Sequence, residues 1–394
     1  MLPSGIVIGR KAPTTAGFSR PKTLNVIVPA YRLGSFRCWR YDAVMSDNGN
    51  LPRRLAPSRA VLVVLALLPA ITETRNAFGQ SPKQGLVDQM LTASSQPAAD
   101  SSFVPKDYVE VFGDEFNEPA LDLSKWWTRY IYNNGMQDSL NDEKERYREN
   151  GNHVMTGATL KLVAKNVRDN DPRGANYESG MIRSKVTMKY GYFEARIRVP
   201  GGVGVWPAFW LNSDAAADGS LAWPPEVDIF EFVNNGKDDR PNMIHMGAII
   251  RAPQKGPHAR PPGTNPWGGD LLYADPKLAG TRGGGGEYIA PFNFPDAFHI
   301  FALLWDTDDT LTWFIDGKPI MKRRYKWVYP EGKDAPYAHV LLNLSIGGNW
   351  AGRYGIDDTA FPQAIEIDYV RVYQKKGNEK TGKSQLGHDL YKDP

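Results

Sequence analysis

Short apolar or alternating runs, separated by Gly, Pro, Asn and Asp, fill the sequence from about Lys106 to Gln374, and no long amphipathic helix is predicted there. Alternation of apolar and polar residues is typical of strands that bury one face, and many short strands between turn residues are typical of an all-β sandwich. We find no internal repeat and therefore expect one folded domain over residues 106–374. The clearest predicted strands are Tyr108–Phe112, Thr159–Ala164, Gly191–Val199, Ala208–Leu211, Glu226–Val233, Ile244–Ile250, His299–Trp305, Leu311–Ile315, His339–Ser345 and Ile365–Tyr373.

Two connections between these runs have a distinct composition. The pair Asp316-Gly317, between Leu311–Ile315 and Ile320–Lys322, predicts a β-hairpin. The stretch Arg251–Gly286 is crowded with Gly and Pro, which predicts one long surface excursion. Such an insertion either shapes a binding site or has no visible role, and both interpretations stay open.

The N-terminal part of the chain is predicted to be an address rather than a fold. Arg53-Arg54 precede the apolar run 60–71, and small residues follow it, as in a secretory signal. The run is shorter than the ~20 residues that cross a bilayer, so we expect cleavage rather than a membrane anchor. Residues 1–79 therefore combine a mis-assigned start, with translation beginning at Met45, and a signal peptide at about 45–79. The mature protein is expected to be secreted or periplasmic, with no membrane contact after cleavage.

Composition limits the remaining interpretations. Residues 80–105 predict a flexible leader, and the polar, basic residues 375–394 predict a disordered tail. The single cysteine, Cys38, excludes an internal disulfide. A net charge of +3 is too small to indicate nucleic acid, which we do not expect as a partner, and we expect a monomer. The 11 Trp, 18 Tyr and 16 Phe can fill a sandwich core or stack on sugar rings.

Three acids stand together in Trp223-Pro-Pro-Glu226-Val-Asp228-Ile-Phe-Glu231-Phe. Side chains alternate along a strand, so Glu226 and Asp228 share one face while Glu231 falls on the other. A β-bulge at Ile229-Phe230 would bring Glu231 back to the same face, and bulges are frequent beside active sites. Three acids on one face repel each other, so a purely structural sequence would rarely place them there.

Retaining glycoside hydrolysis uses such an arrangement, because it needs two carboxyl groups about 5–5.5 Å apart, one ionised and one protonated. We assign Glu226 as the nucleophile and Glu231 as the general acid and then base. Asp228 lies between them and is assigned to orient the nucleophile and separate the two pKa values.

Two other groups were weighed as sites. Glu366 and Asp368 alternate with apolar residues near Arg371, which predicts the solvated face of a terminal strand. His245 could bind a metal, but the chain has six His and no pair at metal-binding spacing, so a hydrogen-bonding histidine in the cleft is favoured.

These residues resemble glycoside hydrolase family 16 over about Asp107 to Gln374. The resemblance rests on several motifs in the family's order: Phe112-Gly-Asp-Glu-Phe-Asn117, Ser179-Gly-Met-Ile-Arg183-Ser, Tyr190-Gly-Tyr-Phe-Glu-Ala-Arg196, Val205-Trp-Pro-Ala-Phe-Trp210, Glu226-Val-Asp228-Ile-Phe-Glu231, Leu342-Asn-Leu-Ser-Ile-Gly-Gly348 and Ile367-Asp-Tyr-Val-Arg-Val-Tyr373.

The resemblance implies a concanavalin-like β-jelly-roll of two curved antiparallel sheets, with the cleft on the concave sheet and retaining cleavage of internal bonds. The roles given to Glu226, Asp228 and Glu231 carry over from the family. No cofactor is implied for catalysis, but a structural calcium is, with Asp368 and the backbone at Gly157 as candidate ligands. The matching substrate-binding positions are Asn152, Arg183, Trp206, Trp210, His245, Asn343 and Trp350.

The substrate class follows from departures within the family. Pro225 replaces the Gly that usually precedes the first catalytic Glu of laminarinases, and the block Asn141–Asn150 looks more like the exopolysaccharide and mixed-linkage group. We therefore predict a β-1,3/1,4-glucan or a glucan-containing bacterial exopolysaccharide. An agarase- or carrageenase-type galactan hydrolase and a transglycosylase remain alternatives. A non-catalytic glycan-binding module is disfavoured because all three carboxylates are present.

Overall fold

The computed structural model describes two β-sheets of eleven and ten strands. The described residues are 103–132, 137–167, 176–215, 223–249, 269–281, 285–329 and 332–384. The eleven-stranded sheet consists of β1 (Tyr108–Asp114), β3 (Glu145–Tyr147), β4 (His153–Met155), β5 (Leu160–Asn166), β6 (Tyr177–Ser179), β9 (Gly191–Arg198), β13 (Leu271–Ala274), β16 (His299–Asp306), β17 (Thr310–Ile315), β18 (Lys318–Arg324) and β20 (Gln363–Lys375). The ten-stranded sheet consists of β2 (Trp126–Trp127), β7 (Met181–Ser184), β8 (Val186–Met188), β10 (Val205–Ser213), β11 (Glu226–Glu231), β12 (Met243–Ile249), β14 (Leu278–Ala279), β15 (Gly285–Ile289), β19 (Ala338–Ile346) and β21 (Thr381–Lys383).

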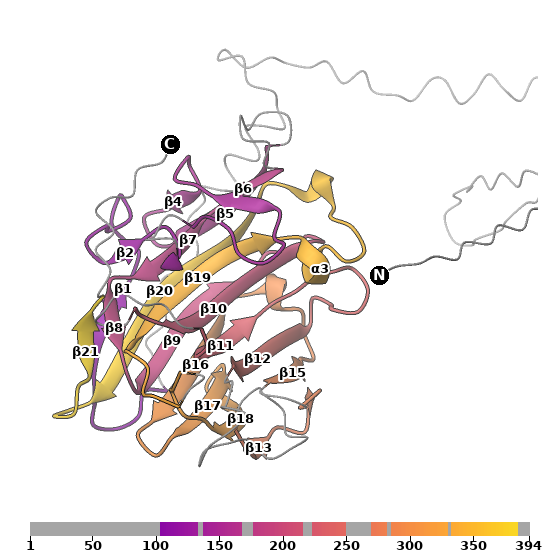
Figure 1. Ribbon diagram of the computed structural model, residues 1–394. Coiled ribbons are helices and arrows are strands. Elements are labelled where there is room, and N and C mark those ends of the chain that lie inside the picture. The colour runs from indigo at the N-terminus through magenta and orange to yellow at the C-terminus, as the bar shows by residue number, and fades with distance from the viewer. Residues whose placement is uncertain are drawn as a thin grey trace, which may run out of the picture. The chain divides into compact units, whose positions relative to one another are not determined.

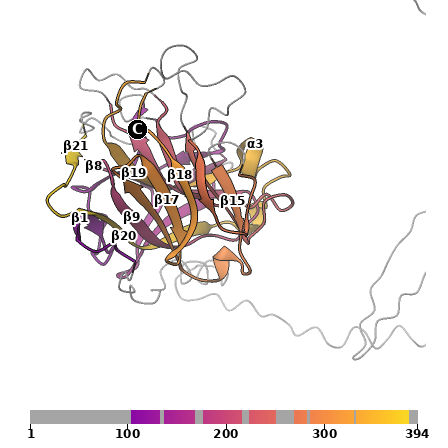
Figure 2. The ribbon, with the colours of Figure 1, turned by 90° about the horizontal axis from the view of Figure 1, so that it is seen from below.

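The strand order shows which segments become neighbours. The main path of the ten-stranded sheet is β14-β15-β12-β11-β10-β19-β7-β2, and β8 and β21 extend it beside β19. The other sheet follows β13-β18-β17-β16-β9-β20-β5-β6-β3, with β1 on β20 and β4 on β5. Pairing is antiparallel throughout the named strands except between β3 and β6. Figures 1 and 2 show the long strands β9, β10, β19 and β20 running close to one another.

One hydrophobic cluster joins the two sheets and forms the main core. Along β9 it takes every second residue, Phe193, Ala195 and Ile197, and along β19 it takes Leu342 and Leu344. Complete burial of a large apolar side chain stabilises the fold by about 1.5–3 kcal/mol, and a slip of one residue would expose the whole set. The period-two pattern of the sequence therefore also fixes the strand register. The two sheets packed around one core confirm the predicted sandwich.

Every predicted strand is present, with bounds shifted by at most three residues. The predicted hairpin is also present: β17 and β18 are joined at Asp316 and Gly317, which have φ angles of 48° and 73°. The helical elements are short, namely η1 (Phe294–Asp296), α3 (Gly348–Ala351) and η2 (Asp358–Ala360). None of the helices in the described part of the chain has the length and apolar character needed to span a bilayer.

The prediction for the terminal acidic pair is wrong. Glu366 and Asp368 on β20 are 2% and 0% exposed, so neither lies on a solvated face. Glu366 pairs with Arg198 and lies 3.8 Å from Lys161 Nζ, and Asp368 pairs with Arg196. The alternation was interpreted correctly as a strand, but both faces of this strand are covered, and partner cations permit carboxylates at buried positions.

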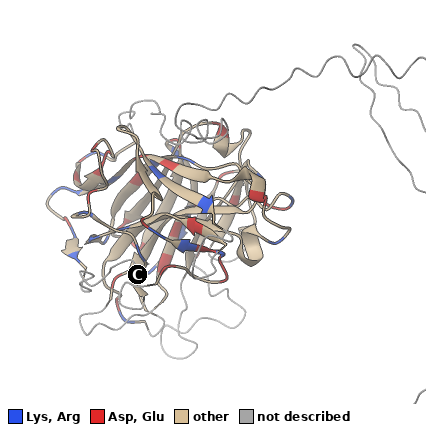
Figure 3. Ribbon diagram, turned by 90° about the horizontal axis from the view of Figure 1, so that it is seen from above, with Lys and Arg blue, Asp and Glu red and all other residues tan. Residues whose placement is uncertain are grey.

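The predicted polar tail also begins too early, because Thr381–Lys383 form β21, which pairs with β8. The excursion 251–286 contributes β13 and β14 where it is described. The signal peptide and nearly all of the leader 80–105 lie outside the described residues. Lys and Arg are interspersed with Asp and Glu along the described ribbon (Figure 3).

Candidate active site

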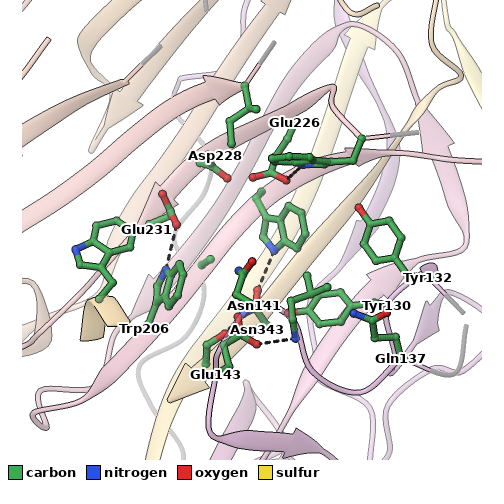
Figure 4. A pocket seen from close by; sticks show the side chains of 17 residues that line it. Tyr130, Tyr132, Gln137, Asn141, Glu143, Trp206, Glu226, Asp228, Glu231 and Asn343 are labelled. Carbon is green, nitrogen blue, oxygen red and sulfur yellow. Dashed lines mark hydrogen bonds between the residues drawn. The ribbon is translucent and has the colours of Figure 1, made fainter. Parts of the chain in front are cut away.

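A cleft of about 670 Å³ lies on the ten-stranded sheet. Its floor comes from three adjacent strands, because β10 lies between β11 and β19. The segment before β3 supplies a wall, and Figure 4 shows these side chains pointing into the same space. The lining residues are Tyr130, Tyr132, Gln137, Leu140, Asn141, Glu143, Trp206, Ala208, Trp210, Trp223, Glu226, Asp228, Glu231, Ile249, Asn343, Ser345 and Trp350.

A β-bulge places the three acids of β11 in this cleft. Phe209 and Trp210 of β10 pair with Phe230 and Asp228 of β11, so Ile229 is the extra residue. The β11–β12 ladder is irregular over the same stretch. Ile229 and Phe230 are both buried in the core, which leaves Asp228 and Glu231 on the opposite face. The bulge is therefore where the sequence predicts it.

The other sheet holds the bulge in place. Trp313 on β17 donates its indole N–H to the main-chain carbonyl of Asp228 at 2.8 Å. A bulge interrupts the ladder, so a buried carbonyl there needs a donor from elsewhere. Tyr325 donates in the same way to the carbonyl of Glu226 at 3.1 Å. The catalytic strand is thus positioned from beneath by two buried aromatic side chains.

Glu226 accepts hydrogen bonds from two directions. The indole N–H of Trp223 reaches its Oε2 at 2.6 Å, and Asp228 forms a second hydrogen bond with it. Burial raises the pKa of Glu226 to about 7, and the negative charge of Glu231 adds to this shift, whereas both hydrogen bonds oppose it. Hydrogen bonds to a carboxylate stabilise its ionised form, as a nucleophile requires.

Asp228 is the most protected of the three acids, with 6% exposure. Burial raises its pKa well above the usual range, and the charges of Glu231 and Glu226 and its hydrogen bond to Glu226 raise it further. Asp228 is therefore the protonated partner, and its hydroxyl donates to the Glu226 carboxylate. A neutral carboxyl group that donates to its neighbour fits the tuning role assigned from the sequence.

Glu231 lies at the other end of β11 from Glu226, and Trp206 donates its indole N–H to Glu231 Oε1 at 3.1 Å (Figure 4). Burial raises the pKa of Glu231, whereas the charge of His245 and the Trp206 hydrogen bond oppose that shift. His245 is the direct cross-strand partner of Glu231 on β12. A raised pKa favours the protonated form of a carboxyl group, which is the form that a general acid requires.

Asp239 stabilises this side of the site from a loop. It accepts hydrogen bonds from His245 Nε2 at 2.7 Å, from Trp350 Nε1 at 3.0 Å and from Asn235 Nδ2 at 2.6 Å. Burial opposes ionisation of Asp239, but the hydrogen bond and the charge of His245 hold its pKa below the usual range. Trp350 also packs edge-on against His245 and Trp206.

Four of the predicted substrate-binding residues line the cleft: Trp206, Trp210, Asn343 and Trp350. Trp210 donates its indole N–H to Asn343 Oδ1 at 2.8 Å, which fixes both side chains. His245 does not line the cleft, and it lies behind Trp350 and beside Asp239.

Two predicted substrate-binding residues are placed elsewhere. Asn152 is completely buried and donates its side-chain amide to the carbonyl of Val163 at 2.9 Å, so it supports the backbone. Arg183 is 1% exposed, stacks 4.3 Å above the ring of Trp127 and donates to the carbonyl of Arg129 at 3.1 Å. These predictions are wrong because matching a family pattern does not tell a residue that contacts substrate from a buried polar residue that supports the backbone.

Several lining residues were not predicted. Tyr130, Tyr132 and Gln137 precede β3 in a segment with no strand pattern, and Asn141 and Glu143 belong to a block used only to judge substrate. Trp223 was treated only as a flank of the catalytic strand. Its position three residues before Glu226 could have indicated a hydrogen-bond donor.

The calcium prediction gains no support from the described residues and stays a prediction. Asp368 is paired with the Arg196 cation, and Gly157 lies in the turn before β5 with a φ of 88°. No group of three or more His, Cys, Asp or Glu side chains in the described ranges could hold a metal ion.

Comparisons with known proteins agree with this geometry. A family model described as "Beta-porphyranase A-D, GH16 domain" matches residues 107–375. The chain belongs to glycoside hydrolase family 16. A Rhodothermus marinus protein named beta-glucanase is 29% identical over 298 residues, which cover 72% of this chain and 92% of that protein. A Niallia circulans protein named glucan endo-1,3-beta-glucosidase A1 is 28% identical over 68% of this chain but only 38% of its own length.

Solved structures give the same result. A non-specific endo-β-1,3(4)-glucanase of family GH16, crystallised with an oligosaccharide at its active site, is 28% identical with a TM-score of 0.54. The match covers 72% of this chain and all of that structure. The fold is therefore the family's β-jelly-roll, and the protein is an endo-acting β-glycanase whose substrate is a polysaccharide.

Proposed function

We propose that this protein is a retaining endo-β-glycanase that hydrolyses a β-1,3/1,4-glucan, with Glu226, Asp228 and Glu231 as its catalytic residues. The observation that carries the proposal is the bulge in β11, which turns all three acids into one cleft. A two-step displacement needs one ionised and one protonated carboxyl group. Burial raises the pKa of both Glu226 and Glu231, and the hydrogen bond from Asp228 favours the ionised form of Glu226.

In the first step, the Glu226 carboxylate attacks the anomeric carbon while Glu231 donates its proton to the leaving glycosidic oxygen. The bond between that carbon and oxygen breaks, and a glycosyl ester on Glu226 forms. The Asp228 hydroxyl donates to Glu226 and orients the attacking oxygen. In the second step, Glu231 takes a proton from water, the water oxygen attacks the anomeric carbon, and Glu226 leaves as a carboxylate.

Aromatic residues of the cleft are suited to hold the sugar chain. Trp206, Trp210, Trp350 and Tyr132 present flat apolar surfaces beside polar groups, an arrangement that binds the faces and hydroxyls of pyranose rings. Asn343 and Ser345 on β19 are hydrogen-bonded to each other and to Tyr147, so they support the floor of the cleft. An extended cleft of this composition supports binding within a chain rather than at its end.

The substrate is proposed as a β-glucan because two of the curated relatives and the solved structure described above are named as enzymes that act on β-glucans. The rival substrate is porphyran, since the matching family model is described as a β-porphyranase. A panel of laminarin, lichenan, agarose, carrageenan and porphyran, scored for new reducing ends, separates the two. An added oligosaccharide acceptor in the same assay reveals transglycosylation as products longer than the substrate.

The roles of the two glutamates can be separated with an activated substrate. Glu226→Gln should lower turnover of laminarin and of an aryl β-glycoside more than about a thousandfold, because both need the nucleophile. Glu231→Gln should lower laminarin turnover similarly, yet retain cleavage of the aryl bond, whose acidic leaving group needs no proton donor.

Glu118→Gln, at an exposed acid, is the control and should match the native protein. Full activity of Glu226→Gln would disprove the assignment of the nucleophile. A first product of the native protein that NMR shows to be α-configured, rather than β-configured, would disprove the retaining mechanism.

Export and a monomeric state are also proposed. Sequencing the N-terminus of the exported protein and measuring its mass in solution test them.

A further inference from the structure

The cleft carries a second pair of acids, Glu143 and Glu145, away from the catalytic strand. Glu143 is partly buried and lines the cleft, whereas Glu145 at the start of β3 is completely buried. Figure 4 shows Glu143 close to Asn141 and Asn343, on the opposite side of the view from Glu226. Neither glutamate takes part in the mechanism above.

Glu145 is the protonated member of this pair. Its Oε2 accepts the main-chain N–H of Ile346 at 2.7 Å, and its buried Oε1 receives no hydrogen bond from the described residues. Burial raises the pKa of Glu145 well above its usual range, and the charge of Glu143 and their mutual hydrogen bond raise it further. A carboxyl group in this position donates its proton to its neighbour, because two adjacent carboxylates cannot both ionise.

Glu143 is the acceptor in the hydrogen bond between the two acids, which favours its ionised form. Its Oε2 accepts the main-chain N–H of Leu140 at 3.0 Å, and burial raises its pKa while the hydrogen bond from Glu145 opposes that shift. No Lys or Arg is among the groups that perturb either carboxyl group, and the further charge acting on Glu143 is that of Asp142. Among the described residues that line the cleft, none is a Lys or Arg that could neutralise the charge of Glu143.

We propose that Glu143, which lines the cleft and accepts the main-chain N–H of Leu140, is a specificity-determining residue that selects uncharged sugar units. Its free lone pairs accept hydrogen bonds from sugar hydroxyls. A sulfate or carboxylate substituent offers no such donor and is repelled by the like charge. The described lining of the cleft also contains Glu226, Asp228 and Glu231 but neither Lys nor Arg, so nothing there would neutralise an anionic sugar.

This inference deepens the proposed function, since it names neutral β-glycans as the preferred substrate class of the same cleft. It also bears on the choice between β-glucan and a sulfated polysaccharide. The full chain carrying Glu226→Gln provides the test, because it should bind sugar without turnover. The probes are a neutral laminarin hexasaccharide and the same hexasaccharide after chemical sulfation, with Kd measured by calorimetry.

The Glu226→Gln protein should bind the neutral hexasaccharide at least about tenfold more tightly than the sulfated one. Adding Glu143→Gln should weaken neutral binding about tenfold, the usual size for a hydrogen bond to a charged group, and should strengthen binding of the sulfated probe. Stronger binding cannot result from misfolding. Glu145→Gln should keep the preference, because its amide can still donate to Glu143 and accept from Ile346.

Asp142→Asn is the matched control, because it removes one charge from the same loop without touching the lining of the cleft. Its preference should stay unchanged. Equal binding of both probes, or an unchanged preference in Glu143→Gln, would overturn the inference. The proposed function fails separately, through absent turnover of neutral glucans by the native protein, whereas the ratio of the two Kd values does not depend on turnover.

Discussion

The hydrogen bond from Asp228 to Glu226 makes a quantitative prediction about the pH profile. With Glu226 as the proposed nucleophile, activity requires its ionised form, so kcat/KM should rise with pH through the pKa of that carboxyl group, which burial raises to about 7. The Asp228 hydroxyl stabilises the ionised form and so holds this pKa down. Asp228→Ala removes the donor and should move the acidic limb to higher pH.

The size of the shift follows from the energy of that bond. A hydrogen bond to a charged group contributes about 1.5–3 kcal/mol, and one pKa unit corresponds to about 1.36 kcal/mol. The acidic limb of Asp228→Ala should therefore move upward by about one to two pH units. Asp228→Asn keeps an N–H donor at the same place and should move the limb much less. Neither substitution alters the main-chain carbonyl that Trp313 binds.

The assay is kcat/KM on a soluble β-glucan between pH 4 and 9, since kcat/KM reports the free enzyme. If the activity of Asp228→Ala is too low for a profile, the rate at which an epoxide-bearing oligosaccharide esterifies Glu226 gives the same pKa. An acidic limb that stays in place in Asp228→Ala would refute the argument. A shift of equal size in Asp228→Asn would show that the Asp228 carboxyl acts through its charge instead.

Two further substitutions test the surroundings of the site. Asp239→Asn removes the charge that pairs with His245, whose positive charge opposes the raised pKa of Glu231. The alkaline limb of the kcat/KM profile should therefore move to higher pH by about 0.5–1 unit. A move to lower pH would contradict the effect of Asp239 on Glu231 through His245. Arg196→Met leaves the buried Asp368 without its ion-pair partner, so the free energy of unfolding should drop by about 3 kcal/mol in urea titrations. An unchanged midpoint would show that the pair contributes nothing.

The fold could be predicted well because the apolar pattern and the register are set by the same physical requirement. Strands such as β9 and β19 turn every second side chain into the core between the sheets, and that periodicity is visible in the sequence. Short strands were missed where this signal is weak: β2 has two residues, and β21 is largely exposed. Their position depends on pairing with β7 and β8, which no local pattern reports.

The shared position of Glu226, Asp228 and Glu231 in one cleft was also predictable, because three acids at this spacing are costly unless chemistry uses them. The groups around the trio were less so. Trp223 donates to Glu226, and Asp239 accepts from His245, but both lie in loop segments whose path the sequence does not specify. Both Trp206 and Arg183 belong to family motifs, but only Trp206 lines the cleft, whereas Arg183 is buried. Membership of a motif therefore did not distinguish the two.

Glu366 and Asp368 show a related limit. Alternation identifies a strand but not what covers its polar face. The deciding residues, Arg196 and Arg198, are on β9, some 170 positions earlier in the chain. A buried carboxylate and a solvated one have the same local sequence, and only the distant cation distinguishes them.

The bulge at Ile229 lets one short strand serve both the core and the cleft. A regular strand that turned Glu226 and Asp228 to the cleft would turn Glu231 into the core, where an unpaired carboxylate is costly. The extra residue corrects this without loss of apolar burial, because Ile229 and Phe230 both remain in the core. It leaves a main-chain carbonyl to be satisfied, and Trp313 of the opposite sheet donates to it. The placement of the acids therefore depends on packing between the sheets as well as on the sequence of β11.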